Sequence, residues 1–179
     1  VRGAPGEYEL LVDGAPFYIK GVSYNPTHDW RDGHYPLTRR QLRKDFSKIR
    51  GMGANTIRRY NPGIYDWNIL TTAQEFDLKV LYGFWFGAET DYYKDSVQVE
   101  KSVQQVERIV RKHKDSPGVL GWTLGNGEWG LLRYYYHPPY LNKVREGYLD
   151  MIERIARRIH EIDPERPVIA VMEHISHLP

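Results

Sequence analysis

Polar and aromatic side chains directly follow several short apolar runs of this sequence. Arginine, asparagine, carboxylate and aromatic residues recur at these points. Planar polar groups hydrogen-bond hydroxyls, aromatic rings cover sugar faces, and carboxylates perform acid/base work. The combination is typical of a carbohydrate site. The segments concerned are Ser23–His28, Arg58–Pro62, Trp85 with Glu89 and Asp91, Asn126–Trp129, and Glu173 with His174.

The runs before these side chains have the length and composition of buried strands, and amphipathic stretches separate them. Leu42, Phe46 and Ile49, for example, recur at helical spacing after Thr38, a suitable N-cap residue. This alternation predicts a parallel sheet covered by helices, which binds ligands at the C-terminal ends of its strands. We expect strands at 17–24, 54–60, 80–85, 119–124 and 168–171, and helices at 38–50, 66–76, 96–113 and 141–162.

The predicted fold class is α/β, and within it the N-terminal half of a (β/α)8 barrel of the TIM type, with about five βα strands. A closed barrel of this type takes about 250 residues, whereas the chain has 179. Residues 1–16 are expected to form a short hairpin, because Asp13-Gly14 is a strong turn signal. We therefore expect two parts, the hairpin at 1–16 and a partial barrel at 17–179.

Composition argues against several other classes of protein. The net charge of +2 arises from 25 basic and 23 acidic residues, which form no basic stripe for nucleic acid. No glycine-rich phosphate loop follows any predicted strand, and no apolar run approaches the 18 residues of a membrane helix. The chain has no cysteine, and its histidines lack the helical spacing of a zinc site. We expect no nucleic-acid partner, no membrane span, no metal and no cofactor.

Three segments in this order resemble the retaining glycosidases of clan A, and most of all the catalytic barrels of glycoside hydrolase family 2. They are YIKGVSY at 18–24, NTIRRY at 55–60 and GWTLGN at 121–126. The likeness extends from about Phe17 to Glu128. It implies a sugar-cleaving site in which two carboxylates lie about 5–5.5 Å apart, one attacking the anomeric carbon and one protonating the leaving oxygen.

The resemblance also assigns roles to particular residues. Arg58 corresponds to the arginine that supports the nucleophilic carboxylate, and Asn126 to the asparagine that contacts the sugar 2-hydroxyl. The general acid/base is a glutamate at the end of the fourth strand, and Glu128 is its candidate here. The other residues that we expect to bind substrate are Trp85, Trp129, Tyr24 and Asn25.

Two departures from the family pattern bear on catalysis. The nucleophile of the family ends the seventh strand, which has no counterpart among the five strands predicted here. In addition, the expected Asn-Glu pair is interrupted, because the sequence reads Asn126-Gly127-Glu128. Either a bulge at Gly127 brings Glu128 round as the acid/base, or Gly127 replaces the catalytic glutamate and Glu128 is a bystander.

Two functions remain open at this point. One is a retaining glycosidase or transglycosidase barrel domain that is incomplete or impaired as this chain, so that the isolated chain is expected to be inactive. The other is a non-catalytic carbohydrate-binding domain with the same fold. The expected partner is an oligo- or polysaccharide, together with the missing half of the barrel or a second copy, because open sheet edges need cover.

The cellular location is not fixed by the sequence. The chain begins with Val1 rather than methionine, so the lack of a leader within it says nothing about secretion. An extracellular or cell-envelope location is favoured over a cytoplasmic one.

Overall fold

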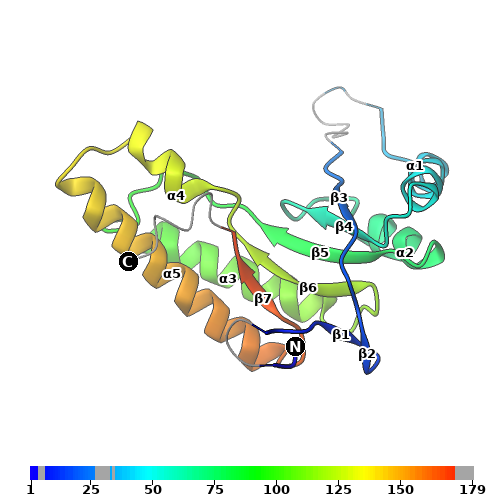
Figure 1. Ribbon diagram of the computed structural model, residues 1–179. Coiled ribbons are helices and arrows are strands. Elements are labelled where there is room, and N and C mark those ends of the chain that lie inside the picture. The colour runs from blue at the N-terminus through cyan, green and yellow to red at the C-terminus, as the bar shows by residue number, and fades with distance from the viewer. Residues whose placement is uncertain (4–6, 27–32, 34, 172–179) are drawn as a thin grey trace. The chain divides into compact units, whose positions relative to one another are not determined.

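The computed structural model describes residues 1–3, 7–26, 33 and 35–171 (Figure 1). The chain divides into two compact units. The first contains the residues up to Arg59 together with 63–81 and 117–120, and the second contains 60–62, 82–116 and the residues from 121 onward.

Five strands make up the main sheet, in the order β3 (Gly21–Ser23), β4 (Thr56–Arg59), β5 (Lys79–Phe84), β6 (Val119–Leu124) and β7 (Val168–Ala170). The strands are parallel, with β3 pairing to β4 from Gly21 opposite Thr56, and β6 pairing to β7 from Trp122 opposite Val168. Helices connect successive strands. The chain is therefore an α/β protein with part of a (β/α)8 barrel, which confirms the predicted fold class.

The first unit begins with a two-stranded antiparallel hairpin, β1 (Leu11–Val12) and β2 (Ala15–Pro16). Asp13 and Gly14 join its strands with φ of 51° and 79°, the left-handed conformation that a tight hairpin turn requires. The division of the chain at residue 16 into hairpin and barrel stays a proposal.

Two helices of the first unit pack against each other, α1 (Arg39–Gly51) and α2 (Asp66–Glu75). Thr38 caps α1, since its side chain accepts a hydrogen bond from the Gln41 N–H at 3.2 Å. Leu42, Phe46 and Ile49 are buried on one side of this helix, as their spacing predicts.

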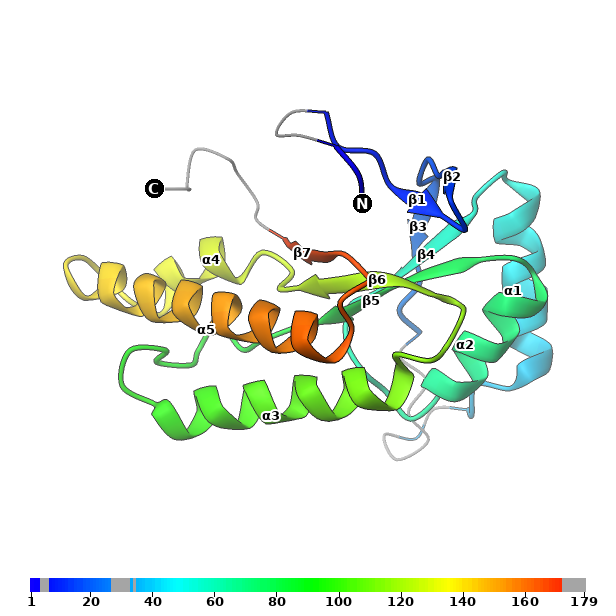
Figure 2. The same ribbon diagram turned by 90° about the horizontal axis from the view of Figure 1, so that it is seen from below.

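The second unit is built around an aromatic core. Trp122 of β6 is fully buried and packs edge-on against Tyr82 and stacked against Phe84, with ring centroids 5.7 and 6.1 Å apart. Helices α3 (Ser96–His113) and α5 (Tyr140–Ile162) lie side by side over this part of the chain (Figure 2). Trp122 thus packs β6 against β5 in the core of this unit.

A buried carboxylate completes the core at Trp122. Asp163 accepts a hydrogen bond from the indole N–H of Trp122 at 2.9 Å and from the Arg166 guanidinium at 3.0 Å. Arg166 also donates to the carbonyls of Lys114 and Ser116, at the turn that leads into β6. The chain leaving α5 is thereby fixed beside the start of β6.

Most element boundaries lie within three residues of their predicted positions. The strand expected at 17–24 is shorter, because only Gly21–Ser23 pairs with β4. The sequence did not predict the short helix α4 (Glu128–Leu131) or the 3-10 turn η2 (Leu132–Tyr134), both too short for a periodic pattern. Within the described residues, no helix is long and apolar enough to cross a bilayer.

Replacing Asp163 by alanine should destabilise the protein by about 1–3 kcal/mol, because the buried Trp122 N–H then has no acceptor. Urea unfolding followed by tryptophan fluorescence measures this loss. Asp150→Ala, at an exposed position of α5, is the control and should change stability by less than about 0.5 kcal/mol. Equal effects of the two variants would contradict the assigned role of Asp163.

Candidate functional site

The turn after β6 carries the sequence that suggested catalysis. Gly125 and Gly127 both adopt the left-handed conformation, with φ of 81° and 95°, so the chain bends twice within three residues. At Gly125 a side chain has no room, since a Cβ there would lie 2.6 Å from the Tyr148 hydroxyl and 2.8 Å from a Glu128 carboxylate oxygen. Gly127 is the N-cap residue of α4. These bends turn the Glu128 side chain into the interior, next to the Asn126 N–H and the Tyr148 hydroxyl.

Glu128 is completely buried, with 0% of its surface exposed. One carboxylate oxygen, Oε1, accepts a hydrogen bond from the Phe86 N–H at 3.0 Å. The other, Oε2, accepts from the Asn126 N–H at 2.5 Å and from the Tyr148 hydroxyl at 3.2 Å. All three partners are donors, so the carboxylate links the loop after β5, the turn after β6 and helix α5.

Two buried tyrosines respond to this charge. Burial raises the pKa of Tyr148 well above its ordinary value, and the negative charge of Glu128 raises it further. The pKa of Tyr92 is raised in the same way, first by burial and then by Glu128. The rings of Tyr92 and Tyr148 meet edge to face with centroids 5.1 Å apart. Both phenols therefore stay neutral around the buried carboxylate.

The predicted substrate residues of the second unit differ in accessibility. Asn126 is half-buried, and its backbone N–H donates to Glu128. Trp85 directly follows β5 and has 54% of its surface exposed, whereas Trp129 is only 8% exposed. The Arg145 guanidinium lies over the Trp129 ring, 5.0 Å from its centroid. Trp85 thus offers a ring face to a ligand, and Trp129 has little free ring surface.

In the first unit the two neighbouring arginines of β4 behave differently. Arg59 is buried and pairs with Asp66 at 3.3 Å, and it also donates to the Tyr24 carbonyl. Arg58, whose side chain alternates with that of Arg59 along the strand, is half-buried. The Tyr24 hydroxyl donates to Asp45 at 2.9 Å, and Asn25 is half-buried beside it in the sequence.

The remaining polar residues predicted at the strand ends fall into two groups. His28, Glu173 and His174 lie outside the described residues. Glu89 and Asp91 lie in the loop after β5, where the Glu89 carbonyl and the Asp91 carboxylate accept hydrogen bonds from the Tyr136 and Tyr140 hydroxyls. In the part of the chain that the structure describes, no group of three His, Asp or Glu side chains could hold a metal ion.

Sequence reasoning did not find the partners of Glu128. Tyr148 lies on the buried side of the helix predicted at 141–162, but its hydroxyl has no sequence signature. The Phe86 N–H is a backbone group, which no motif identifies. Only the doubled glycine around Asn126 could have signalled that the turn folds back on itself.

A partial parallel barrel with arginine, asparagine and carboxylate side chains at its strand ends is the architecture of a glycoside hydrolase catalytic domain. The chain belongs to glycosyl hydrolases family 2, whose TIM barrel domain matches residues 6–178.

Several β-glucuronidases are similar to this chain. That of Chlorocebus aethiops is 26% identical over 168 residues, which cover 92% of this chain and 23% of that protein. The Homo sapiens β-glucuronidase is 25% identical over 166 residues, covering 91% and 23%. The chain thus spans about a quarter of the length of these relatives.

Solved structures show the same fold. A Bacteroides uniformis β-glucuronidase superposes with a TM-score of 0.69 at 20% identity, covering 89% of this chain and 19% of that one. A family 2 β-galacturonidase from Eisenbergiella tayi, bound to galacturonate, gives a TM-score of 0.66 at 20% identity, covering 90% and 26%.

Glu128→Gln should destabilise the protein by about 1.5–3 kcal/mol, since an amide nitrogen would face at least one of three donors. Chemical unfolding measures the change. Glu165→Gln, at an exposed position, removes the same charge and should be nearly neutral. If both substitutions left stability unchanged, Glu128 would not be the anchor of this turn.

The raised pKa of Tyr148 predicts a loss of stability at alkaline pH. Its contribution is fully present below about pH 10, where the unfolded tyrosine is neutral, and declines as the pH rises above that value. The unfolding free energy should fall by up to about 1.4 kcal/mol per pH unit for this group alone. Unfolding measured from pH 8 to 11 should show a shallower fall in Tyr148→Phe than in the unchanged protein. Identical slopes would contradict this assignment.

Proposed function

We propose that this chain is the carbohydrate-binding part of a retaining-glycosidase-type barrel, and that Glu128 serves the structure of the site and not as its general acid/base. The complete burial of the Glu128 carboxylate is the observation that carries the proposal. A general acid must reach the leaving oxygen of the substrate, directly or through one water. Glu128 instead directs both oxygens at donors of its own unit.

Gly127 also supports the proposal that Glu128 is not the general acid/base. It follows Asn126 at the position where the family resemblance implies the acid/base glutamate, and it has no side chain to donate a proton. Its φ of 95° is favourable for glycine and strained for glutamate. The turn is therefore built for glycine at this position, and reversion to glutamate would require the backbone to change as well.

The groups that would hold a sugar are those left accessible at the strand ends. Asn126 would contact a ring hydroxyl, Trp85 would cover a sugar face, and Arg58 would take the role implied for it by the family resemblance. Tyr24 and Asn25 of the first unit and Trp129 of the second are further candidates for contact with the substrate. We expect an oligo- or polysaccharide, and the names of the relatives make a hexuronide the first class to test.

Asn126→Ala should weaken the binding of phenyl β-D-glucuronide or galacturonide about tenfold, which corresponds to the loss of one hydrogen bond worth about 1.4 kcal/mol. Isothermal titration calorimetry measures the affinity. Asn142→Ala, an exposed asparagine of α5, is the matched control and should bind like the unchanged protein. Equal affinity in both variants would remove Asn126 from the proposed site.

The unchanged protein should not hydrolyse p-nitrophenyl β-D-glucuronide above the uncatalysed rate, because the described residues include no seventh barrel strand and the Glu128 carboxylate is fully buried. Release of p-nitrophenolate, followed by absorbance, measures this directly. Rapid turnover that Glu128→Gln abolishes without unfolding the protein would assign the acid/base role to Glu128 and overturn the proposal.

A further inference from the structure

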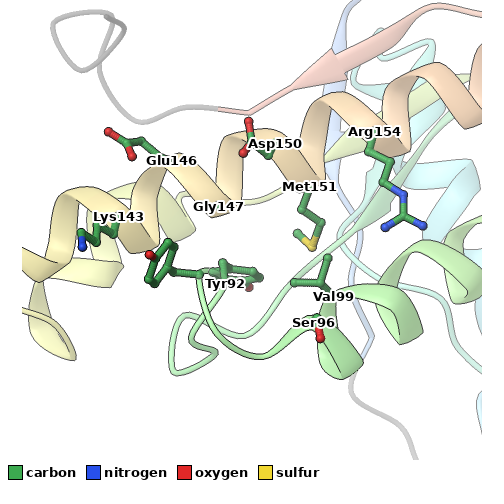
Figure 3. A pocket seen from close by; sticks show the side chains of 10 residues that line it. Tyr92, Ser96, Val99, Lys143, Glu146, Gly147, Asp150, Met151 and Arg154 are labelled. Carbon is green, nitrogen blue, oxygen red and sulfur yellow. The ribbon is translucent and has the colours of Figure 1, made fainter.

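A groove of about 340 Å³ lies in the second unit between the loop before α3, the first turns of α3 and the neighbouring part of α5 (Figure 3). None of its lining residues belongs to the turn at Asn126 to Glu128. Its volume falls at the lower end of the range found for small-molecule sites. It is therefore a hollow of its own, separate from the candidate sugar site.

The floor of the groove is apolar and its depth depends on a glycine. Val99 of α3 and Met151 of α5 point into it from opposite sides (Figure 3). At Gly147 the backbone of Tyr92 comes so close that a Cβ would lie 2.5 Å from the Tyr92 carbonyl oxygen. Any side chain at 147 would push α5 and this loop apart, so the shape of the groove requires glycine there.

One wall of the groove is an aromatic ring held in place from two sides. Tyr93 has 53% of its surface exposed, and its ring meets the edge of Tyr140 with centroids 6.1 Å apart. The Lys143 ammonium lies 5.3 Å from the centroid of Tyr93. Tyr140 is in turn fixed by its hydrogen bond to Asp91 at 2.7 Å. A wall fixed before binding loses little conformational entropy when a ligand arrives.

Free hydrogen-bonding groups surround this apolar and aromatic surface. The Ser96 hydroxyl and the Lys143 ammonium form no hydrogen bond or ion pair with the described residues. Arg154 is already paired with Glu100, at 2.5 Å. The Glu146 and Asp150 carboxylates also line the groove, from the side of α5 that faces away from Ser96 (Figure 3). The groove therefore presents both hydrogen-bond donors and acceptors beside a ring.

We propose that this groove is a second glycan-binding site, which takes one pyranose unit of an oligosaccharide away from the strand ends. A pyranose has an apolar face for Tyr93 and the Val99–Met151 floor, and hydroxyl oxygens for Ser96 and Lys143. The inference rests on the proposed function in one respect, because a barrel that binds carbohydrate at its strand ends gains from holding the same polymer elsewhere.

The test compares two hexasaccharide probes, hyaluronan hexasaccharide and laminarihexaose, by isothermal titration calorimetry on the whole chain. Tyr93→Ala and Ser96→Trp, which remove the wall and fill the groove, should each weaken the better-bound hexasaccharide at least tenfold. Lys143→Met, at an exposed position of the rim, should weaken the binding of the same hexasaccharide about threefold. Because this substitution does not disturb packing, its effect cannot be attributed to misfolding, unlike that of Tyr93→Ala or Ser96→Trp. Tyr35→Ala, at a tyrosine 90% exposed in the first unit, is the control and should change nothing.

The outcomes separate this site from the candidate sugar site. The groove proposal is overturned if the folded variants Tyr93→Ala and Ser96→Trp retain hexasaccharide binding. It is also overturned if the unchanged protein binds neither hexasaccharide. Binding of phenyl glycosides that is lost in Asn126→Ala and kept in Tyr93→Ala leaves the proposed function intact in either case. If Asn126→Ala still binds the hexasaccharide in the groove, and the unchanged protein binds no phenyl glycoside, the proposed function is contradicted and the groove proposal is not.

Discussion

The buried carboxylate of Glu128 holds the C-terminal ends of β5 and β6 in relation to α5. Its two oxygens receive three hydrogen bonds from three different segments, at Phe86, Asn126 and Tyr148. Because every partner donates, the ionised form satisfies all of them, and the burial of a charge is tolerated only with such compensation. The position of Asn126 in the turn follows directly from this arrangement.

The same hydrogen bonds explain why anchoring and acid catalysis conflict at this residue. A general acid carries a proton that it delivers to substrate, whereas both Glu128 oxygens receive bonds from within the unit, and a proton on Oε1 would face the Phe86 N–H, which can only donate. To reach a sugar, the side chain would have to abandon three bonds and leave a fully buried place. The doubled glycine at 125 and 127 makes the inward path of the chain possible and leaves no other carboxylate at the turn.

Much of the fold follows from sequence periodicity, because strands and helices leave patterns in apolar spacing. The ranges of α3 and β6 are those predicted, and Thr38 caps α1 as expected. The site could be predicted only in part. Alternation along β4 predicts that Arg58 and Arg59 face opposite sides, whereas the pairing of Arg59 with Asp66 depends on a fold-back at Gly63 that no pattern reveals. The direction of the Glu128 side chain was undecidable from sequence, because it depends on two backbone angles in the turn.

Glycine has a different physical role at each of the two candidate sites. At the turn after β6 it supplies positive φ and space for a buried carboxylate, so the backbone bends toward the core. At Gly147 the helix has ordinary geometry, and the missing side chain lets the Tyr92 backbone approach. Tyr92 joins the two, since its ring packs on Tyr148, the partner of Glu128, while its backbone closes the groove. Glu128 and the groove are thus connected by packed side chains, because the Tyr148 hydroxyl bonds the carboxylate and the Tyr148 ring contacts that of Tyr92.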